Sequence, residues 1–252
     1  MKINKCRACK SDKLEACLNL GKQALTGVFP KNKNEKITVG NLSLIFCENC
    51  KLLQLGENFN RNEMYGINYG YKSSLKPTMV SHLKSKAIQL QSISKLSSKD
   101  IVIDIGSNDG TFLSFFKNNL TLIGIDPTIN KFKNDYRKNI IKIPTFFSED
   151  LVNKYSKKKA KLITSISMFY DLEDPLSFAK EIYNCLDKDG LWHFEQSYMP
   201  NMIKNISYDT ICHEHLEYYS LRSIEYILRK SDFKIIDIQL NKVNGGSFAL
   251  TV

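Results

Sequence analysis

IVIDIGSNDGT at residues 101–111 decides the fold of this chain, together with LIGID at residues 122–126. Residues 101–105 form an almost wholly apolar run, which is typical of a buried strand in a parallel sheet. Gly106 and Gly110 then let the backbone turn sharply and approach a bound ligand closely. We expect a helix over residues 111–118 to follow. The stretch therefore predicts a strand, a ligand-binding turn and a helix.

The second strand ends in Asp126, about 20 residues beyond Gly106, where a carboxylate can accept both hydroxyls of a ribose. A dinucleotide-binding dehydrogenase, which is one alternative, usually carries G-x-G-x-x-G, whereas residues 104–110 follow D-x-G-x-x-x-G. That pattern is similar to the S-adenosylmethionine loop of Rossmann-like methyltransferases. A turn without a ligand is the other alternative. To the cofactor site we assign Asp104, Gly106, Ser107, Asn108, Gly110, Thr111, Asp126, Pro127 and Met168.

Strand and helix patterns alternate along the rest of the chain. They predict helices at residues 75–96, 175–185 and 221–230, and strands at residues 122–125, 140–143, 162–166, 191–195, 233–240 and 247–252. Such alternation is typical of a parallel sheet covered by helices, and the closing hairpin through Asn244-Gly245-Gly246 adds an antiparallel edge. We predict an α/β fold of the Rossmann-like class I methyltransferase type, with a mostly parallel seven-stranded sheet.

Two C-x-x-C pairs lie in the first 60 residues: Cys6 with Cys9, and Cys47 with Cys50. Each pair can present two thiolates from one tight turn, and four thiolates complete a tetrahedral zinc site without room for water. The zinc would therefore be structural; unpaired cysteines or one redox pair are the alternatives. We predict a zinc-binding domain at residues 1–60, a linker with a lead-in helix at 61–98 and a methyltransferase domain at 99–252.

Residues 208–220, YDTICHEHLEYYS, are the most unusual stretch of the chain. They follow the last predicted parallel strand, so we expect them near the carboxyl ends of the strands, where ligands bind. His213 and His215 flank Glu214; a histidine can remove a proton near neutral pH, and the carboxylate can orient its ring or hold the substrate. The spacing differs from the H-E-x-x-H of metal sites. A structural cluster of polar and aromatic groups is the alternative.

The composition limits the classes of function. The net charge of +10 would suit nucleic acid, yet only five of the 36 basic residues are arginine and the basic residues are spread along the chain. We therefore expect a small-molecule substrate, and a zinc-containing nucleic-acid-binding protein is the alternative from another class. No apolar run reaches the ~20 residues of a membrane span, and the N-terminus lacks a signal-peptide pattern. We expect a cytoplasmic protein.

Taken together, these motifs resemble the sugar C-methyltransferase family, whose members join a zinc-binding domain, a Rossmann-like methyltransferase domain and a C-terminal domain. The matching stretches are the two C-x-x-C pairs and residues 69–74 (YGYKSS), 104–110, 124–127, 209–219 and 244–247. The resemblance implies that His215 is the base and that Tyr69 or Tyr71 contributes to the active site. It also implies removal of a proton beside a 4-keto group of a nucleotide-linked sugar, and methylation of the resulting enolate.

The chain departs from that family in two places. Cys212 stands where the sugar enzymes often have a tyrosine, and the chain ends where their C-terminal domain would begin. We expect a short member of the family with a nucleotide-, phosphate- or sugar-linked acceptor from cell-surface polysaccharide synthesis (capsule or O-antigen). O-methylation with His215 as general base is the expected reaction, and C-methylation of a 4-keto sugar is the alternative.

Overall fold

A computed structural model describes residues 1–66 and 69–252 of the chain, which packs as two compact units. The first unit comprises Met1–Gly70, Ser167–Lys180 and Glu195–Leu250, and the second comprises Tyr71–Ile166, Glu181–Phe194 and Thr251–Val252. Each unit thus combines segments that are distant in sequence. The domain boundaries that the sequence suggests at residues 60 and 98 stay a prediction, and residues 67–68 of the predicted linker lie outside the described residues.

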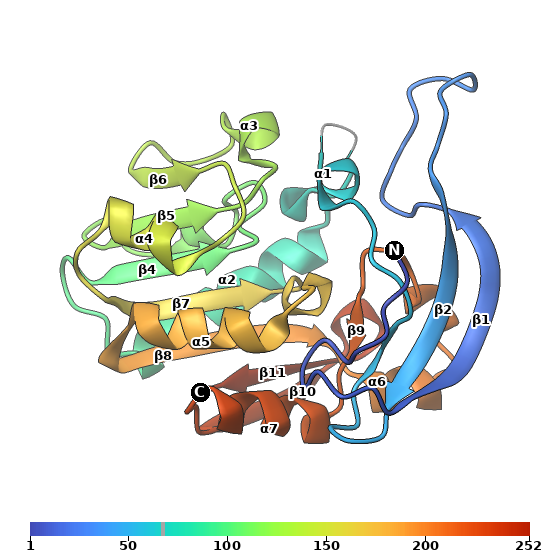
Figure 1. Cartoon of the computed structure of the whole chain (residues 1–252). Coiled ribbons are helices and arrows are strands. Elements are labelled where there is room, and N and C mark those ends of the chain that lie inside the picture. The colour runs from blue at the N-terminus through green and yellow to red at the C-terminus, as the bar shows by residue number, and fades with distance from the viewer. Residues whose placement is uncertain (67–68) are drawn as a thin grey trace. The chain divides into compact units, whose positions relative to one another are not determined.

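A seven-stranded sheet has the strand order β10-β11-β8-β7-β4-β5-β6 (Figure 1). Its strands are β4 (Ile101–Ile105), β5 (Thr121–Ile125), β6 (Ile140–Ile143), β7 (Ala160–Ile166), β8 (Leu186–Ser197), β10 (Asp237–Asn241) and β11 (Ser247–Thr251). β4 runs parallel to both β5 and β7, and β5 runs parallel to β6. Every residue of β4 is buried, as expected for a strand with helices on both faces. The predicted Rossmann-like fold with a mostly parallel seven-stranded sheet is confirmed.

Most of the predicted helices are present. α2 (Pro77–Ile93), α5 (Pro175–Cys185) and α7 (Leu221–Lys230) stand where apolar spacing placed them, and the short helices α3 (Ile129–Phe132), α4 (Glu149–Tyr155) and α6 (Met199–Lys204) were not predicted. The helix predicted at residues 111–118 is wrong, because this segment forms only the 3-10 turn η2 (Leu113–Phe115). Phe112, Leu113 and Phe116 are drawn into the apolar core instead, and the chain returns at once to β5.

A second sheet contains four antiparallel strands in the order β1-β2-β3-β9. β1 (Leu14–Ala24) and β2 (Val39–Cys47) form a long hairpin, drawn in blue in Figure 1, and the short β3 (Leu53–Leu55) follows. The fourth strand, β9 (Glu217–Tyr218), comes from far along the chain and immediately follows the His-Glu-His stretch. Their shared apolar core includes Leu44, Leu55, Ile211 and Leu216. The chain begins α1 (Arg61–Met64) after this sheet.

Within residues 1–66 and 69–252, no helix combines the length and the apolar character needed to cross a membrane.

Candidate functional site

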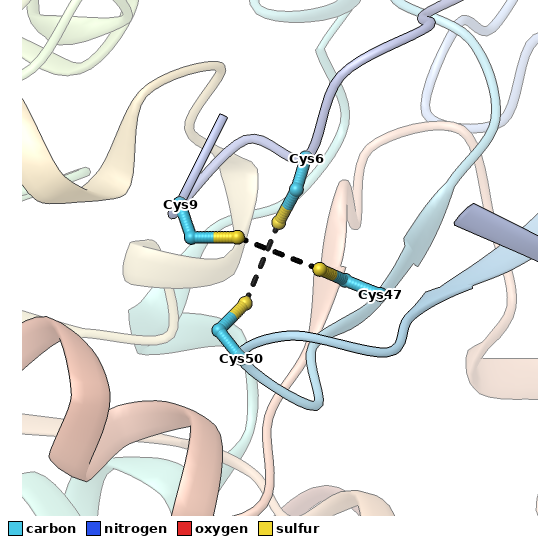
Figure 2. Close-up of side chains that lie close together, drawn as sticks. All are labelled: Cys6, Cys9, Cys47 and Cys50. Atoms are coloured by element: carbon cyan, nitrogen blue, oxygen red, sulfur yellow. Dashed lines mark hydrogen bonds between the residues drawn. The ribbon is translucent and has the colours of Figure 1, made fainter. Parts of the chain in front are cut away.

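The four cysteines of the two C-x-x-C pairs converge on one point (Figure 2). Their Sγ atoms all lie within 4.8 Å of one another, and the Cys6–Cys50 and Cys9–Cys47 Sγ pairs are each 3.5 Å apart. A tetrahedral zinc ion with Zn–S bonds of about 2.3 Å requires sulfur–sulfur distances of about 3.8 Å. The quartet therefore fits Zn²⁺, and four thiolates leave it no open position for chemistry.

The two cysteine turns are built alike. The N–H of Lys10 donates to the carbonyl of Cys6 at 3.0 Å, and the N–H of Lys51 donates to the carbonyl of Cys47 at 2.9 Å. Both lysines have a positive φ, 59° and 63°, which folds each turn tightly enough to aim two sulfurs inward. A hydrogen bond from the Cys50 thiol lowers the pKa of Cys6, which favours the thiolate form that zinc binds.

The first turn also holds a buried ion pair with β9. The Nε atom of Arg7 lies 3.8 Å from Oε1 of Glu217, and both side chains are almost completely buried. The Arg7 guanidinium further donates to the carbonyls of Leu55 and Glu57 at 2.5 and 3.0 Å. Burial raises the pKa of Glu217, and Arg7 opposes that rise. Through this pair the zinc turn is tied to the strand that begins two residues after His215.

The predicted cofactor loop is a tight turn at the end of β4. Gly106 and Gly110 have φ values of 76° and 75°, and Asn108 between them has a φ of 49°. A side chain on Gly110 would collide with the ring of Tyr136. The Tyr136 hydroxyl in turn bonds the Ser107 hydroxyl at 2.8 Å and the Asn108 carbonyl at 2.9 Å. Tyr136 thus supports the loop, and sequence reasoning missed it because it lies in no motif.

Two buried carboxylates stand at this turn. Asp126 accepts hydrogen bonds from the N–H of Asn108 at 2.9 Å and from the N–H and hydroxyl of Thr128 at 2.6 and 2.5 Å. Burial nevertheless raises the pKa of Asp126. Asp104 accepts from the Thr164 hydroxyl at 2.6 Å. The glycine turn and the two buried acidic side chains beside it fit S-adenosylmethionine, and the contact of Asp126 with the ribose hydroxyls stays a prediction.

Residues 71–74 fold against the same loop. The Asn108 side chain donates to the Tyr71 carbonyl at 3.2 Å and accepts from the Ser73 N–H at 2.9 Å. The Asp109 carboxylate accepts from the N–H of Ser74 at 3.0 Å and, within the loop, from that of Thr111 at 3.1 Å. Residues 71–74 of the stretch YGYKSS thus support the cofactor loop through hydrogen bonds. The sequence analysis singled out this stretch only because it resembles the family.

Asp104→Asn should flatten the dependence of stability on pH. Burial raises the pKa of Asp104 to about 7, against about 3.9 in an unfolded chain. Between about pH 4 and 7 the native state therefore keeps a proton that the unfolded state has lost. The free energy of unfolding falls as pH rises, by about 1.4 kcal/mol per pH unit and about 4 kcal/mol in all.

Urea unfolding at pH 5 and pH 7 measures this slope. Asparagine is neutral at both values, so the difference in slope between Asp104→Asn and the unchanged protein isolates Asp104. The matched control is Asp150→Asn, which changes an exposed aspartate at the start of α4. Equal slopes in Asp104→Asn and the unchanged protein would contradict the assignment of a proton to Asp104.

The ring of His215 is held so that one nitrogen can act as a base. Its Nδ1 atom lies 3.0 Å from the carbonyl of Thr210, which can only accept a hydrogen bond. Nδ1 therefore carries the proton of the neutral ring, and Nε2 keeps the lone pair. The ring also packs on Tyr170, with 4.1 Å between the ring centroids. This tautomer is the one a general base at Nε2 requires.

His213 differs sharply from His215. Its side chain is fully buried, Nδ1 accepts from the N–H of Thr26 at 3.4 Å, and Nε2 donates to the Gly40 carbonyl at 3.3 Å. Burial lowers the pKa of His213, which keeps the ring neutral. Because both nitrogens bond backbone groups of the N-terminal segment, we assign His213 to holding the His-Glu-His stretch in place.

The carboxylate of Glu214 lies against Gly27, and a side chain added at Gly27 would collide with that carboxylate. Gly27 has a φ of 76°, so this position favours glycine for its backbone as well as for space. Burial raises the pKa of Glu214, and the nearby His215 opposes that rise. Burial also raises the pKa of Cys212 to about 11, so this thiol stays neutral beside the proposed base.

The structure groups the predicted site residues within the two units. The second unit brings together Asp104, Gly106, Ser107, Asn108, Gly110, Thr111, Asp126 and Pro127, and it also contains Tyr71. The first unit holds His213, Glu214, His215, Tyr69 and Met168. Tyr69 is half-buried, and its ring lies 5.6 Å from that of Tyr65. Met168 comes just before the 3-10 turn η3 (Phe169–Asp171).

Sequence reasoning missed two residues that contact the His-Glu-His stretch, Tyr65 and Tyr170. Tyr170 packs on the ring of His215 and follows a parallel strand, β7, and that position was the one signal that could have found it. Tyr65 belongs to no motif, and its hydroxyl reaches the Glu214 carbonyl at 3.4 Å.

Two family models match the chain. One, described as "Methyltransferase domain", matches residues 79–238. The other, described as "Putative zinc binding domain", matches residues 6–65 and so includes all four cysteines of the quartet.

Among curated proteins, the chain is similar to C-methyltransferase NovU of Streptomyces niveus. The two are 24% identical over 253 residues, which is 98% of this chain and 60% of NovU. The chain therefore spans less than two thirds of the length of that relative. A shorter match, to carboxy-S-adenosyl-L-methionine synthase of Nautilia profundicola, is 35% identical over 103 residues and covers 38% of this chain and 44% of that protein.

Solved structures with a similar fold include two methyltransferases that contain bound SAH. The plantazolicin methyltransferase BpumL has a TM-score of 0.53 at 14% identity, with 70% of this chain and 85% of that chain covered. The magnesium protoporphyrin IX methyltransferase of Synechocystis PCC 6803 has a TM-score of 0.52 at 11% identity, with 73% and 89% covered. At these identities the likeness concerns the fold.

Proposed function

Because this chain belongs to the methyltransferase-domain family, we propose that it methylates a sugar-linked acceptor with S-adenosylmethionine and that His215 removes the acceptor's proton. The observation that carries the proposal is the hydrogen bond between Nδ1 of His215 and the Thr210 carbonyl, which leaves Nε2 as the basic atom. The zinc ion would hold the first unit together and take no part in the chemistry.

The proposed reaction has one proton to move. When bound, S-adenosylmethionine would supply a methyl group on its sulfonium, and neutral S-adenosylhomocysteine would leave as the S–CH3 bond breaks and its electron pair returns to sulfur. Nε2 of His215 takes the acceptor's proton, and the electron pair left on the acceptor forms the new bond to the methyl carbon. The residues around His215 hold its tautomer and its ring plane, so that the basic atom is oriented before the acceptor binds.

We favour a carbon beside a keto group as the methylated atom, since NovU is named a C-methyltransferase and matches 98% of this chain. O-methylation of a sugar hydroxyl is the second candidate, because the same imidazole can remove a hydroxyl proton. The net charge of +10 supports an acceptor that carries phosphate, as nucleotide-linked sugars do. We further propose a role in cell-surface polysaccharide synthesis and a cytoplasmic location. The cytoplasmic location is supported by the seven cysteines, none of which forms a disulfide, because thiols stay reduced in that compartment.

Two acceptors distinguish the candidates: a nucleotide-linked 4-keto sugar and the matching sugar with a 4-hydroxyl group. With cofactor labelled in its methyl group, the chemical shift of the product's methyl carbon separates C-methyl from O-methyl. We expect a C-methyl product from the keto sugar and, in deuterated water without cofactor, exchange of the proton beside the keto group. An O-methyl product from the hydroxyl sugar would replace our first candidate with the second. Failure with both acceptors would refute a sugar-linked acceptor.

A further inference from the structure

Gln196 lies one residue before the end of β8 and carries a primary amide that the described residues leave unbonded. The side chain is completely buried, and neither its oxygen nor its nitrogen has a hydrogen-bond partner among residues 1–66 and 69–252. A primary amide can donate two hydrogen bonds and accept two. Burying it with none of them made costs free energy, so its presence here calls for an explanation beyond packing.

The neighbours of Gln196 on the adjacent strand are aromatic. The N–H of Tyr198 donates to the carbonyl of Gly246 at 3.0 Å, and in this antiparallel register Gln196 lies opposite Phe248 on β11. Alternation along β8 puts Tyr198 on the same face as Gln196, and its ring packs on that of Phe248 with 4.9 Å between the centroids. The amide therefore lies beside aromatic rings on a strand end, which is an apolar setting for a group that needs hydrogen bonds.

Two residues with an unusual backbone stand on either side of the end of β8. Ser167 directly follows β7 and has a φ of 55°, and Asn244 comes shortly before β11 with a φ of 51°. This left-handed region is uncommon for residues other than glycine, and serine adopts it less readily than asparagine. Backbone strain of this kind concentrates at functional sites. Asn244 also opens the stretch NGGS at residues 244–247, one of the stretches that resemble the sugar C-methyltransferase family.

The side chains of Ser167 and Asn244 meet across the end of β8. Nδ2 of Asn244 donates to the Ser167 hydroxyl at 3.5 Å, and β8 is the strand that separates β7 from β11 (Figure 1). The N–H of Ser167 donates to the carbonyl of Glu195 at 2.7 Å, which places Ser167 level with Gln196. Asn244 is exposed and its hydrogen bond is long, so little free energy holds this contact closed. A contact that a ligand can replace thus crosses the strand end that carries the unbonded amide.

The ends of β7 and β8 are both joined to the segment around His215. Beyond β8, the N–H of Met199 donates to the carbonyl of Tyr219 at 2.9 Å. Beyond β7, the ring of Tyr170 packs on that of His215 at 4.1 Å, and the carbonyl of Tyr170 accepts from the N–H of Leu216 at 2.8 Å. An acceptor whose proton His215 removes would therefore lie near the carboxyl ends of these two strands, where open parallel sheets bind ligands.

We propose that Gln196 is a specificity-determining residue that binds two neighbouring hydroxyl groups of the acceptor sugar. This inference rests on the proposed function, because it takes the acceptor to be a sugar. The amide nitrogen donates to one hydroxyl oxygen, and the amide oxygen accepts from the other hydroxyl. The sugar reaches the amide when the exposed contact between Ser167 and Asn244 opens. A site built in this way rejects an analogue that lacks a hydroxyl, because its own buried groups then stay unbonded.

The test compares two acceptors in the whole protein: a nucleotide-linked 4-keto sugar with two neighbouring hydroxyl groups, and its analogue that lacks one of them. We expect the unchanged protein to prefer the first by about 100-fold or more in kcat/KM. Gln196→Met keeps the length of the side chain and removes the amide, so kcat/KM for the first sugar should fall by about the same factor, mainly through KM. Turnover of the analogue should change little, and the preference should therefore disappear.

Thermal unfolding separates this role from a structural one. Because Gln196→Met removes an unbonded buried amide, its melting temperature should stay the same or rise. The matched control is Gln91→Met in α2, where the amide nitrogen donates to the carbonyls of Ala87 and Phe115 at 3.1 and 3.3 Å and the oxygen accepts from the N–H of Lys117 at 3.1 Å. Gln91→Met should melt at a lower temperature and keep the preference between the two sugars.

An unchanged preference in folded Gln196→Met, with methyl transfer intact, would refute the role of Gln196 and leave the proposed function standing. If Gln196→Met does not fold, Gln196→Leu answers the same question. Calorimetry with each sugar covers the opposite case. Binding of the first sugar that Gln196→Met weakens, without methyl transfer in the unchanged protein, would refute the proposed reaction and support the sugar site. Failure of the unchanged protein to bind either sugar would refute both.

Discussion

Replacing His215 with asparagine should lower kcat by about 100- to 10,000-fold while the affinity for S-adenosylmethionine changes little. Asparagine can still donate to the Thr210 carbonyl, which lies 3.0 Å from Nδ1, so the local fold is kept. What the variant loses is the lone pair on Nε2. His215→Ala, which also removes the packing on Tyr170, should be at least as impaired.

Turnover of a nucleotide-linked 4-keto sugar measures kcat, and calorimetry with S-adenosylmethionine measures the affinity for the cofactor. His82→Asn in α2 is the matched control, because it makes the same substitution outside the proposed machinery. Normal turnover in both His215 variants would show that another group takes the proton. A parallel loss of cofactor affinity would instead indicate that the substitution had damaged the fold.

Removal of the metal should unfold the first unit. Structural zinc sites bind with apparent free energies of about 10–16 kcal/mol, and this binding contributes directly to the folding of the segment that holds the ligands. The loss should propagate to β9, because Arg7 stands between two of the ligands and pairs with Glu217. We therefore expect Cys47→Ser, or a strong chelator, to abolish the cooperative unfolding transition of the first unit and to remove activity.

Metal analysis and thermal unfolding followed by circular dichroism check this prediction. The unchanged protein should contain one zinc per chain, and Cys17→Ser, which alters an exposed thiol outside the quartet, should keep both the zinc and the melting temperature. A metal-free protein with an unchanged unfolding transition would mean that the first unit does not need zinc to fold.

Local signals carried the prediction of the parallel sheet. The largely apolar runs at Ile101–Ile105 and Ile140–Ile143 are long enough for buried strands. Two glycines and the carboxylate of Asp104 mark the turn that follows Ile101–Ile105. The loop residues assigned to the cofactor from spacing alone do come together in the second unit. Their contact with the cofactor stays a prediction.

Elements that form through tertiary contacts could not be predicted from local sequence patterns. Nearly every residue of β1 is exposed and its pairing with β2 has two irregularities, so burial of apolar side chains does not define this strand. β9 is only two residues long and forms by pairing with β3. The helix predicted at residues 111–118 failed because its apolar side chains enter the core from a 3-10 turn.

The pairing of Leu53 with Tyr218 has a consequence for how the protein is made. When a ribosome has synthesised the zinc ligands, the last strand of their sheet is still roughly 165 residues away, or about ten to thirty seconds at ordinary elongation rates. During that time β3 exposes an unpaired edge, and the Arg7 guanidinium has no counter-charge from Glu217. The sheet of the nascent chain therefore lacks its fourth strand until residues 217–218 have been synthesised. Early zinc binding would fold the two cysteine turns during that time and so limit aggregation of the N-terminal segment.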